Sequence, residues 1–365
     1  CSDDNILNPP PYVYHIPEQT NDGWQTASLE DVGIDESIIG GAIDRINYNL
    51  YQNVHSILIV KDGKLVFEEY FSGYKWDYNG DQFRGEFTEF GINTIHNMAS
   101  VTKSFTSALV GIAIDHGFIQ DVDEKVFTFF PEYSYLNNEQ KDRIAVKHLL
   151  SMSAGLEWDE WSYPYTDSRN SHVAMNRSGD PIRYVLARPV VAGPGETFVY
   201  NSGLSITLGG AIYNASEYRA DKFAEEFLFG PLGITDYSWE RYPNGTIQTG
   251  GGLYLRPRDM AKLGYLYLQD GVWNGRQIIS KEWIEESTKT HISIDSVWRY
   301  GYQWWLRTYH VNSRSIESFA ARGWGGQNII VFPTLNMVVV FTGGNYATPE
   351  PVDEILTRFI LPALD

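Results

Sequence analysis

The sequence predicts a mixed α/β fold in which one sheet is assembled from both ends of the chain, with a mainly helical domain inserted between them. Three observations predict it. Strand-like runs occur before residue 70 and again after residue 300, helical spacing without clear strand alternation dominates the middle, and a last helix follows the final strands. At 365 residues the chain is long enough for two domains. It can bury a core that needs no disulfide or metal ion.

The domain ranges follow from this layout. Residues 1–27 are rich in proline, aspartate and asparagine and show no sustained periodicity, so we expect a flexible tether there. We expect the sheet domain to comprise residues 28–117 together with 248–365. The mainly helical insertion is expected to comprise residues 118–247.

The sheet domain is expected to begin with a helix and a hairpin. Asp35 is a good N-cap for a helix that runs to about residue 50. Two apolar runs around the turn at residues 61–64 predict a hairpin, and a loop rich in glycine, aspartate and asparagine is expected from there to about Asn93. The other predicted elements are strands over 56–60, 65–70, 301–309, 327–332 and 337–342, and helices over 101–116, 257–268 and about 351–364.

Composition excludes several classes of function. The net charge of −18 would repel a nucleic acid, and no run of lysine and arginine offsets it. No apolar run is long enough for a transmembrane helix. The chain has no His-Glu-x-x-His and no phosphate-binding glycine-rich loop, so we expect neither a metal nor a cofactor. It has no Gly-x-Ser-x-Gly elbow, which disfavours an α/β-hydrolase fold. The 11 tryptophans and 24 tyrosines fit either a large core or an aromatic-lined cleft.

Cys1 is the only cysteine. One interpretation is a trimmed chain that begins at cysteine by chance. The other is an exported bacterial lipoprotein, because Cys1 followed by small and polar residues and then by prolines resembles the start of a mature lipoprotein. We favour the second, which implies a periplasmic or cell-surface protein whose only membrane attachment is a lipid on Cys1.

The stretch Ser100-Val-Thr-Lys103 has the residue types and spacing of a nucleophile and its base. It opens a predicted helix, and residues three apart share a helix face, so the Lys103 amine can reach the Ser100 hydroxyl. A serine needs a neighbour to take its proton, and a desolvated lysine has a lowered pKa that suits the task. The Ser100 N–H, unpaired in the first turn, points toward developing negative charge. A plain N-cap serine is the alternative interpretation.

The same spacing occurs a second time, at Ser72-Gly-Tyr-Lys75. This copy contains Gly73 and lies in a glycine- and aspartate-rich turn, where no helix would align the two side chains. We interpret it as a chance match.

Several further motifs follow in order, and with them the sequence resembles the family of class C β-lactamases, DD-peptidases and serine esterases over about residues 30–365. The resemblance implies an α+β fold in which an antiparallel sheet is flanked by N- and C-terminal helices. It also implies that Ser100 is a nucleophile that forms an acyl-enzyme. The matching stretches are 97–106, 116–126, 130–132, 146–156, 194–203 and 253–268.

The resemblance assigns Tyr200 as a general base or proton relay beside Lys103. From the residues alone, a tyrosine such as Tyr200 would more often be a packed aromatic side chain. Its place in the ordered series of family motifs is what makes it a catalytic candidate. The family pattern is Tyr-x-Asn, whereas here Ser202 takes the asparagine position and Asn201 is displaced by one. Both are therefore candidate substrate-binding residues.

The third family motif departs most from the pattern. β-Lactamases carry Lys-Thr-Gly or His-Thr-Gly on a strand, and the corresponding strand is expected here over 321–327, in a run similar to the 6-aminohexanoate-dimer hydrolase and esterase branch. Gly323 would let the substrate backbone lie close, and the Trp324 N–H would be the second oxyanion donor. Arg322 is the candidate to replace the missing lysine. Trp158 is a candidate wall of the acyl pocket, with packing inside the insertion as the alternative.

We therefore expect a serine hydrolase that acts on a small ester, amide or peptide-like substrate. A β-lactamase or DD-peptidase is less favoured because the lysine of the third motif is missing. A penicillin-binding or sensing lipoprotein on the same fold shares Ser100 and Lys103 and stays open as the alternative. The insertion and the loop near residues 70–93 are expected to set the substrate.

Overall fold

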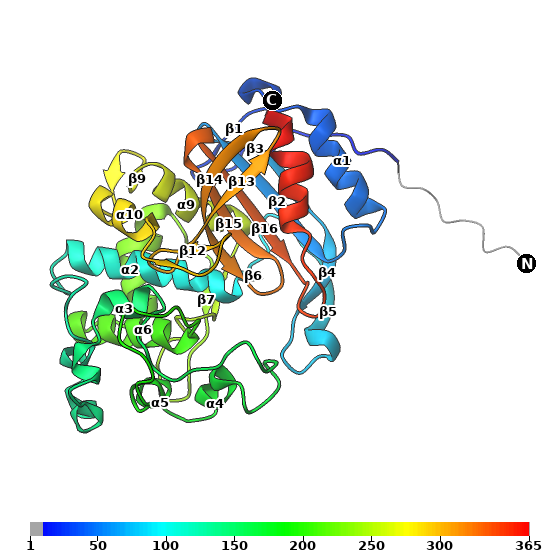
Figure 1. The fold of residues 1–365 in the computed structure, drawn as a ribbon. Helices are drawn as coiled ribbons and strands as arrows, with labels where there is room; N and C mark the ends of the chain where they lie inside the picture. The colour runs from blue at the N-terminus through cyan, green and yellow to red at the C-terminus, as the bar shows by residue number, and fades with distance from the viewer. Residues whose placement is uncertain (1–9, 365) are drawn as a thin grey trace, which may run out of the picture.

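The computed structural model describes residues 10–364 and is dominated by one nine-stranded sheet (Figure 1). The strand order is β1-β3-β2-β16-β15-β14-β13-β12-β11, with β1 parallel to β3 and the other neighbours antiparallel. This confirms the mixed fold and the sheet built from both ends of the chain. Cys1 lies outside the described residues. The strands are β1 (Gln25–Thr26), β2 (Val54–Lys61), β3 (Lys64–Tyr70), β11 (Ile292–Ser293), β12 (Arg299–Tyr300), β13 (Trp305–Val311), β14 (Arg314–Gly323), β15 (Gln327–Phe332) and β16 (Met337–Gly343).

Helices cover both faces of this sheet. On one face α1 (Glu36–Asn47) packs with α11 (Val352–Ile355), which continues through a π-turn over Leu356–Ile360 (Figure 1). On the other face lie α2 (Thr102–Asp115) and α9 (Pro257–Leu268). Successive side chains of β2 therefore enter different cores, because neighbours on a strand point to opposite faces.

The middle of the chain is mainly helical, as expected. A small sheet ties it to the large one: β7 (Tyr237–Trp239) pairs with β8 (Leu253–Leu255), and β8 pairs with β6 (His96–Asn97). This sheet brings the segment before Ser100 next to the glycines at 250–252. The α-helices of this region are α3 (Val146–Leu150), α4 (Ser171–Asn176), α5 (Pro181–Leu186), α6 (Ser202–Ser216), α7 (Ala220–Ala224) and α8 (Gly230–Leu232). Between α9 and β11 lie β9 (Val272–Trp273), β10 (Arg276–Gln277) and α10 (Lys281–Thr288).

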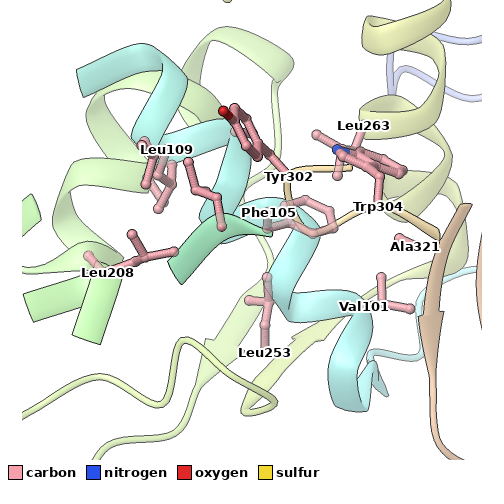
Figure 2. Close-up of a cluster of buried hydrophobic side chains, with 14 of the residues drawn as sticks. Val101, Phe105, Leu109, Leu208, Leu253, Leu263, Tyr302, Trp304 and Ala321 are labelled. Carbon is pink, nitrogen blue, oxygen red and sulfur yellow. The ribbon is translucent and has the colours of Figure 1, made fainter. Parts of the chain in front are cut away.

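Helix α2 is the central buried element of the molecule. Its residues from Thr102 to Ala113 are all buried. Figure 2 shows Phe105 and Leu109 of α2 among side chains of α6, β8 and the segment around Trp304. Because packed interiors resist displacement, whatever α2 carries at its start is held in a fixed position.

Two local predictions are wrong. The loop expected up to Asn93 contains a hairpin of β4 (Ser72–Trp76) and β5 (Arg84–Glu89). Its side chains are mostly exposed, so no clear alternation marks it in the sequence. The strand expected over 321–327 is instead the end of β14, a turn with positive φ at Gly325 and Gly326, and the start of β15.

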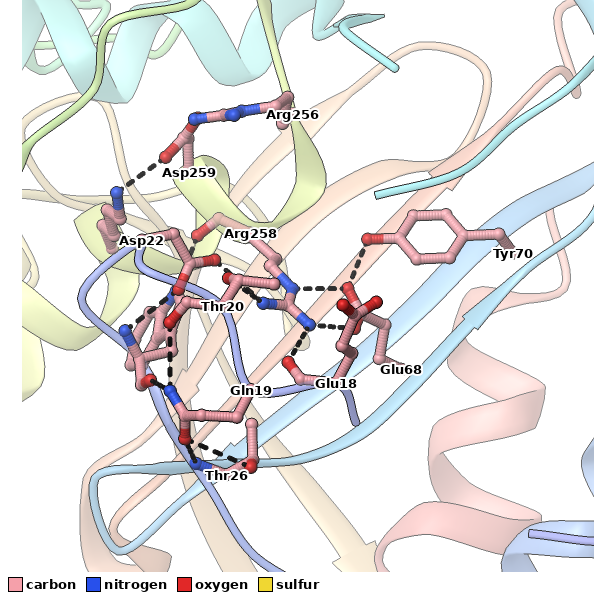
Figure 3. A network of polar contacts seen from close by, with 12 residues as sticks. Glu18, Gln19, Thr20, Asp22, Thr26, Glu68, Tyr70, Arg256, Arg258 and Asp259 are labelled. Atoms are coloured by element: carbon pink, nitrogen blue, oxygen red, sulfur yellow. Dashed lines mark hydrogen bonds and ion pairs between the residues drawn. The ribbon is translucent and has the colours of Figure 1, made fainter. Parts of the chain in front are cut away.

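The predicted tether is also wrong for residues 10–27. Trp24 is 2% exposed, and its indole N–H donates to the Arg258 carbonyl. The Arg258 guanidinium donates in turn to Asp22, to Glu68 and to the Glu18 carbonyl (Figure 3). An extended segment held by one aromatic side chain and a polar network has no periodicity, so the sequence pattern did not reveal it.

Candidate active site

Ser100 lies in a strained turn at the start of the buried helix. It is the middle residue of a 3-10 turn over Ala99–Val101, which leads directly into α2. Ala99 has φ of 44°, an unfavourable value for a residue with a side chain. Its N–H donates to the Asn97 side chain at 2.7 Å, which fixes the turn. Strain of this kind is common at functional sites, and here it lies directly before Ser100.

Lys103 contacts Ser100 directly, as the spacing predicts. Its Nζ lies 2.9 Å from Ser100 Oγ and donates to the Gly250 carbonyl at 2.5 Å. The side chain is 2% exposed. Burial lowers the pKa of Lys103 to about 8, against an opposing effect of the Glu160 charge.

Tyr200 comes to the same point from the segment just before α6. The Lys103 ammonium lies 5.0 Å from the centre of its ring, and Trp161 stacks on the ring at 5.2 Å. Burial and the charge of Glu160 raise the pKa of Tyr200 above its usual value, and a hydrogen bond with Ser100 opposes that shift. The three predicted catalytic residues thus converge.

Glu160 is a buried carboxylate that the sequence interpretation missed. It is 3% exposed and accepts hydrogen bonds from the indole of Trp158, from the backbone and hydroxyl of Ser202, and from Tyr165. Burial alone would raise the pKa of Glu160, but His172, Lys103 and the Ser202 hydrogen bonds together lower it. A charged carboxylate therefore sits beside the Lys103 and Tyr200 pair.

The end of β14 lies against the nucleophile turn. A Cβ on Gly323 would lie 2.5 Å from the Met98 carbonyl oxygen and 3.0 Å from the Ser100 nitrogen. Only glycine allows this approach, so Gly323 accommodates the Ser100 turn itself, not the substrate as expected. The next residue, Trp324, lines the cavity described below.

Arg322 is not a substrate-binding residue. Its guanidinium pairs with Glu350 at 2.7 Å and with Asp353 at 3.2 Å. Strand alternation turns its side chain toward α11, on the face of the sheet away from Ser100.

Three other predicted contacts are structural. The Asn201 side chain caps α6 by accepting from the Leu204 N–H, Ser202 is held by Glu160, and Trp158 belongs to the buried core cluster. Of the three, only Ser202 lines the cavity. The wall role proposed for Trp158 is therefore wrong.

A cavity of about 400 Å³ opens at Ser100. It is lined by the β4–β5 hairpin, by the nucleophile turn, by the insertion and by the end of β14. Within the part of the chain that the structure describes, no group of three or more His, Cys, Asp and Glu side chains could hold a metal ion. The lining residues are Trp76, Tyr78, Asn97, Ala99, Ser100, Glu160, Tyr165, His172, Val173, Asn176, Arg177, Ser202, Glu240, Gln248, Gly250, Gly251, Trp324 and Tyr346.

Two buried histidines, His55 and His96, lie next to the segment that leads into the nucleophile turn. His96 Nδ1 lies 2.8 Å from the Asn97 carbonyl, which can only accept, so this nitrogen carries the proton. His96 Nε2 then accepts from His55 Nδ1 at 2.8 Å, and both rings are neutral. Burial lowers the pKa of His55 to about 2 and that of His96 to about 4.

This pair predicts a loss of stability in mild acid. The unfolded chain binds protons at these histidines below their ordinary pKa of about 6.5, and the folded chain does not, so stability is complete above that pH and falls as the pH drops toward 4. Each histidine contributes a slope of about 1.4 kcal/mol per pH unit. Urea unfolding between pH 6 and pH 5 should show this fall. His55→Gln should reduce the slope of the unfolding free energy against pH by about 1.4 kcal/mol per pH unit. An unchanged slope in that variant would contradict the neutral, buried state of His55.

The comparisons with known proteins show the family of the chain. A family model described as Beta-lactamase matches residues 52–362. The 6-aminohexanoate-dimer hydrolase of Paenarthrobacter ureafaciens is 26% identical over 268 residues, which cover 67% of this chain and 65% of that protein. The chain thus spans slightly less than two thirds of this relative.

Two solved structures share the fold. A putative 6-aminohexanoate-dimer hydrolase from Bacillus anthracis superimposes with a TM-score of 0.69 at 22% identity, covering 86% of this chain and 79% of that one. A family VIII carboxylesterase superimposes with a TM-score of 0.68 at 17% identity, covering 90% of this chain and 97% of that one.

Proposed function

Because the chain belongs to the beta-lactamase family, we propose that it is a serine hydrolase that cleaves an ester or amide through an acyl-enzyme on Ser100. The observation that carries this proposal is the 2.9 Å contact between Lys103 Nζ and Ser100 Oγ at a cavity that can hold a substrate. Tyr200 lies beside both. The relatives that are named hydrolases and esterases support the same class of reaction.

In the first step neutral Lys103 takes the proton of the Ser100 hydroxyl as its oxygen attacks the carbonyl carbon. The hydrogen bond from Lys103 to the Gly250 carbonyl holds the amine beside the Ser100 hydroxyl, where the neutral amine can present its lone pair to the hydroxyl proton. With a pKa of about 8, Lys103 is neutral often enough near neutral pH to act as a base. The carbonyl oxygen becomes an oxyanion, and the N–H groups of Ser100 and Trp324 are the donors assigned to it.

Tyr200 then serves as the acid. Because burial and Glu160 raise its pKa, it is a phenol and not a phenolate. It gives its proton to the leaving oxygen or nitrogen as the bond to the carbonyl carbon breaks, and it regains a proton from the Lys103 ammonium. A water molecule repeats the sequence on the acyl-enzyme and releases the acid and Ser100.

Labelling and turnover together test this proposal. A fluorophosphonate probe should modify Ser100, as identified by peptide mass spectrometry, and the unlabelled protein should turn over 4-nitrophenyl acetate repeatedly. Labelling without turnover would favour a sensor, and the same assay with a penicillin decides whether β-lactams are bound or hydrolysed. The absence of both labelling and turnover would refute the proposal.

Glu160→Gln predicts a shift in the pH dependence of the reaction. The Glu160 charge raises the Lys103 pKa, so its removal should lower that pKa further. The rising limb of kcat/KM, expected near pH 8 in the native chain, should move to lower pH. A full pH–rate profile with the ester, at equal thermal stability, measures this. A uniform loss of rate with an unmoved limb would reduce Glu160 to a structural role.

A further inference from the structure

Aromatic rings from distant parts of the chain gather on one side of the cavity. Trp76 lies with its ring centroid 5.3 Å from that of Trp324 and 4.6 Å from that of Tyr346. The Tyr165 ring centroid lies 5.0 Å from that of Trp324. We call Trp76, Tyr78, Tyr165, Trp324 and Tyr346 the aromatic wall, and all five line the cavity.

The β4–β5 hairpin supplies two members of this wall, Trp76 and Tyr78, and contacts the helical insertion. Phe83 stacks on Trp76 at 5.2 Å and holds its ring in place. The Tyr78 hydroxyl donates to the Tyr165 carbonyl at 2.8 Å, which joins the hairpin to the helical insertion. The part of the hairpin that lines the cavity is thus held in place by these contacts.

The charges around the cavity do not suit a carboxylate-bearing substrate. The lining holds two carboxylates, Glu160 and Glu240, and one guanidinium, Arg177, which is exposed at the end of α4. Arg322, which lies two residues before Trp324 near the end of β14, pairs with Glu350 and Asp353. Among the described lining residues Arg177 is thus the one arginine or lysine, and none of the five wall residues carries a charge that would pair with a carboxylate.

Resting on the hydrolase function proposed above, we infer that the aromatic wall is the specificity site, and that it binds an uncharged apolar group of the substrate, aromatic or branched. Within this wall Trp76, from the β4–β5 hairpin, is the main determinant of that preference. Face and edge contacts with such a group favour large flat substituents. A carboxylate in the same place would lose its hydration without gaining a cation.

A series of 4-nitrophenyl esters tests this inference, because the leaving group stays constant while the acyl group changes. We expect kcat/KM for the phenylacetate to exceed that for the acetate by about 10-fold or more. The hydrogen succinate should be poorer than the butanoate, which has the same chain length without the charge. In Trp76→Leu the ratio of phenylacetate to acetate should fall about 10-fold.

Phe87→Ala is the matched control. Phe87 lies on the same hairpin, is 59% exposed and is not part of the cavity lining, so this variant should keep both the ratio and the absolute rates. An unchanged ratio in Trp76→Leu, or a preference for the succinate, would overturn the inference. Failure of Ser100 labelling and of acetate turnover would instead refute the hydrolase function itself.

Discussion

Ser100→Ala is expected to lower kcat/KM for 4-nitrophenyl acetate by about 10⁴-fold or more. The variant keeps the cavity and the backbone donors but loses the atom that forms the acyl-enzyme, so only the residual catalysis of binding and oxyanion stabilisation remains. The loss should fall on kcat, since Ser100 Oγ adds little to ground-state binding. Steady-state kinetics with the native chain alongside measure the effect.

The second Ser-x-x-Lys copy provides the control. Ser72 lies on the exposed strand β4, and Lys75 pairs with Glu86 at 3.1 Å. Ser72→Ala should leave the rate of acetate hydrolysis and the fluorophosphonate labelling unchanged. If Ser72→Ala abolished labelling and Ser100→Ala kept it, the wrong serine would have been assigned. Full activity in Ser100→Ala would remove the acyl-enzyme mechanism.

The fold and the family could be predicted from the sequence because their signals are local or ordered. Asp35 caps α1 as expected, and the apolar spacing from Val101 onward marks α2. The order of the motifs along the chain led to the family that the comparisons then confirmed. The predicted convergence of Ser100, Lys103 and Tyr200 needed the family resemblance as well, because no spacing connects residues 103 and 200.

The missed residues share one property: their role depends on partners remote in sequence. Glu160 is an ordinary acidic residue in an aromatic stretch until the fold brings Ser202 and Lys103 beside it. Trp76 lies in an exposed hairpin whose sequence shows no alternation of apolar and polar residues. Only its contact with Trp324 places it at the cavity.

Arg322 and Gly323 show the reverse error. Each was given a role toward a substrate, and each is used within the protein instead: one in an ion-pair network behind the sheet, the other to let β14 approach the Ser100 turn. The motif located the segment that reaches the Ser100 turn, but a motif does not say which way a side chain points or what fills the space beside a glycine.

Replacing Lys103 has the second largest expected effect and separates two mechanisms. If the neutral amine is the base, Lys103→Met should lower kcat by about 10²- to 10⁴-fold. Lys103→Arg should do the same, because a guanidinium stays protonated and cannot accept the Ser100 proton. If Lys103 acted only as a cation that stabilises a Tyr200 phenolate, arginine would keep much of the activity and methionine would not.

The structure favours the first outcome. A carboxylate next to Tyr200 opposes the phenolate, and burial of Lys103 favours the neutral amine, so the two groups are poised as phenol and amine. The kcat values of the two Lys103 variants with 4-nitrophenyl acetate, measured in parallel with thermal unfolding to verify folding, decide between the mechanisms. Substantial activity in Lys103→Arg would mean that Tyr200, and not Lys103, is the base that accepts the Ser100 proton.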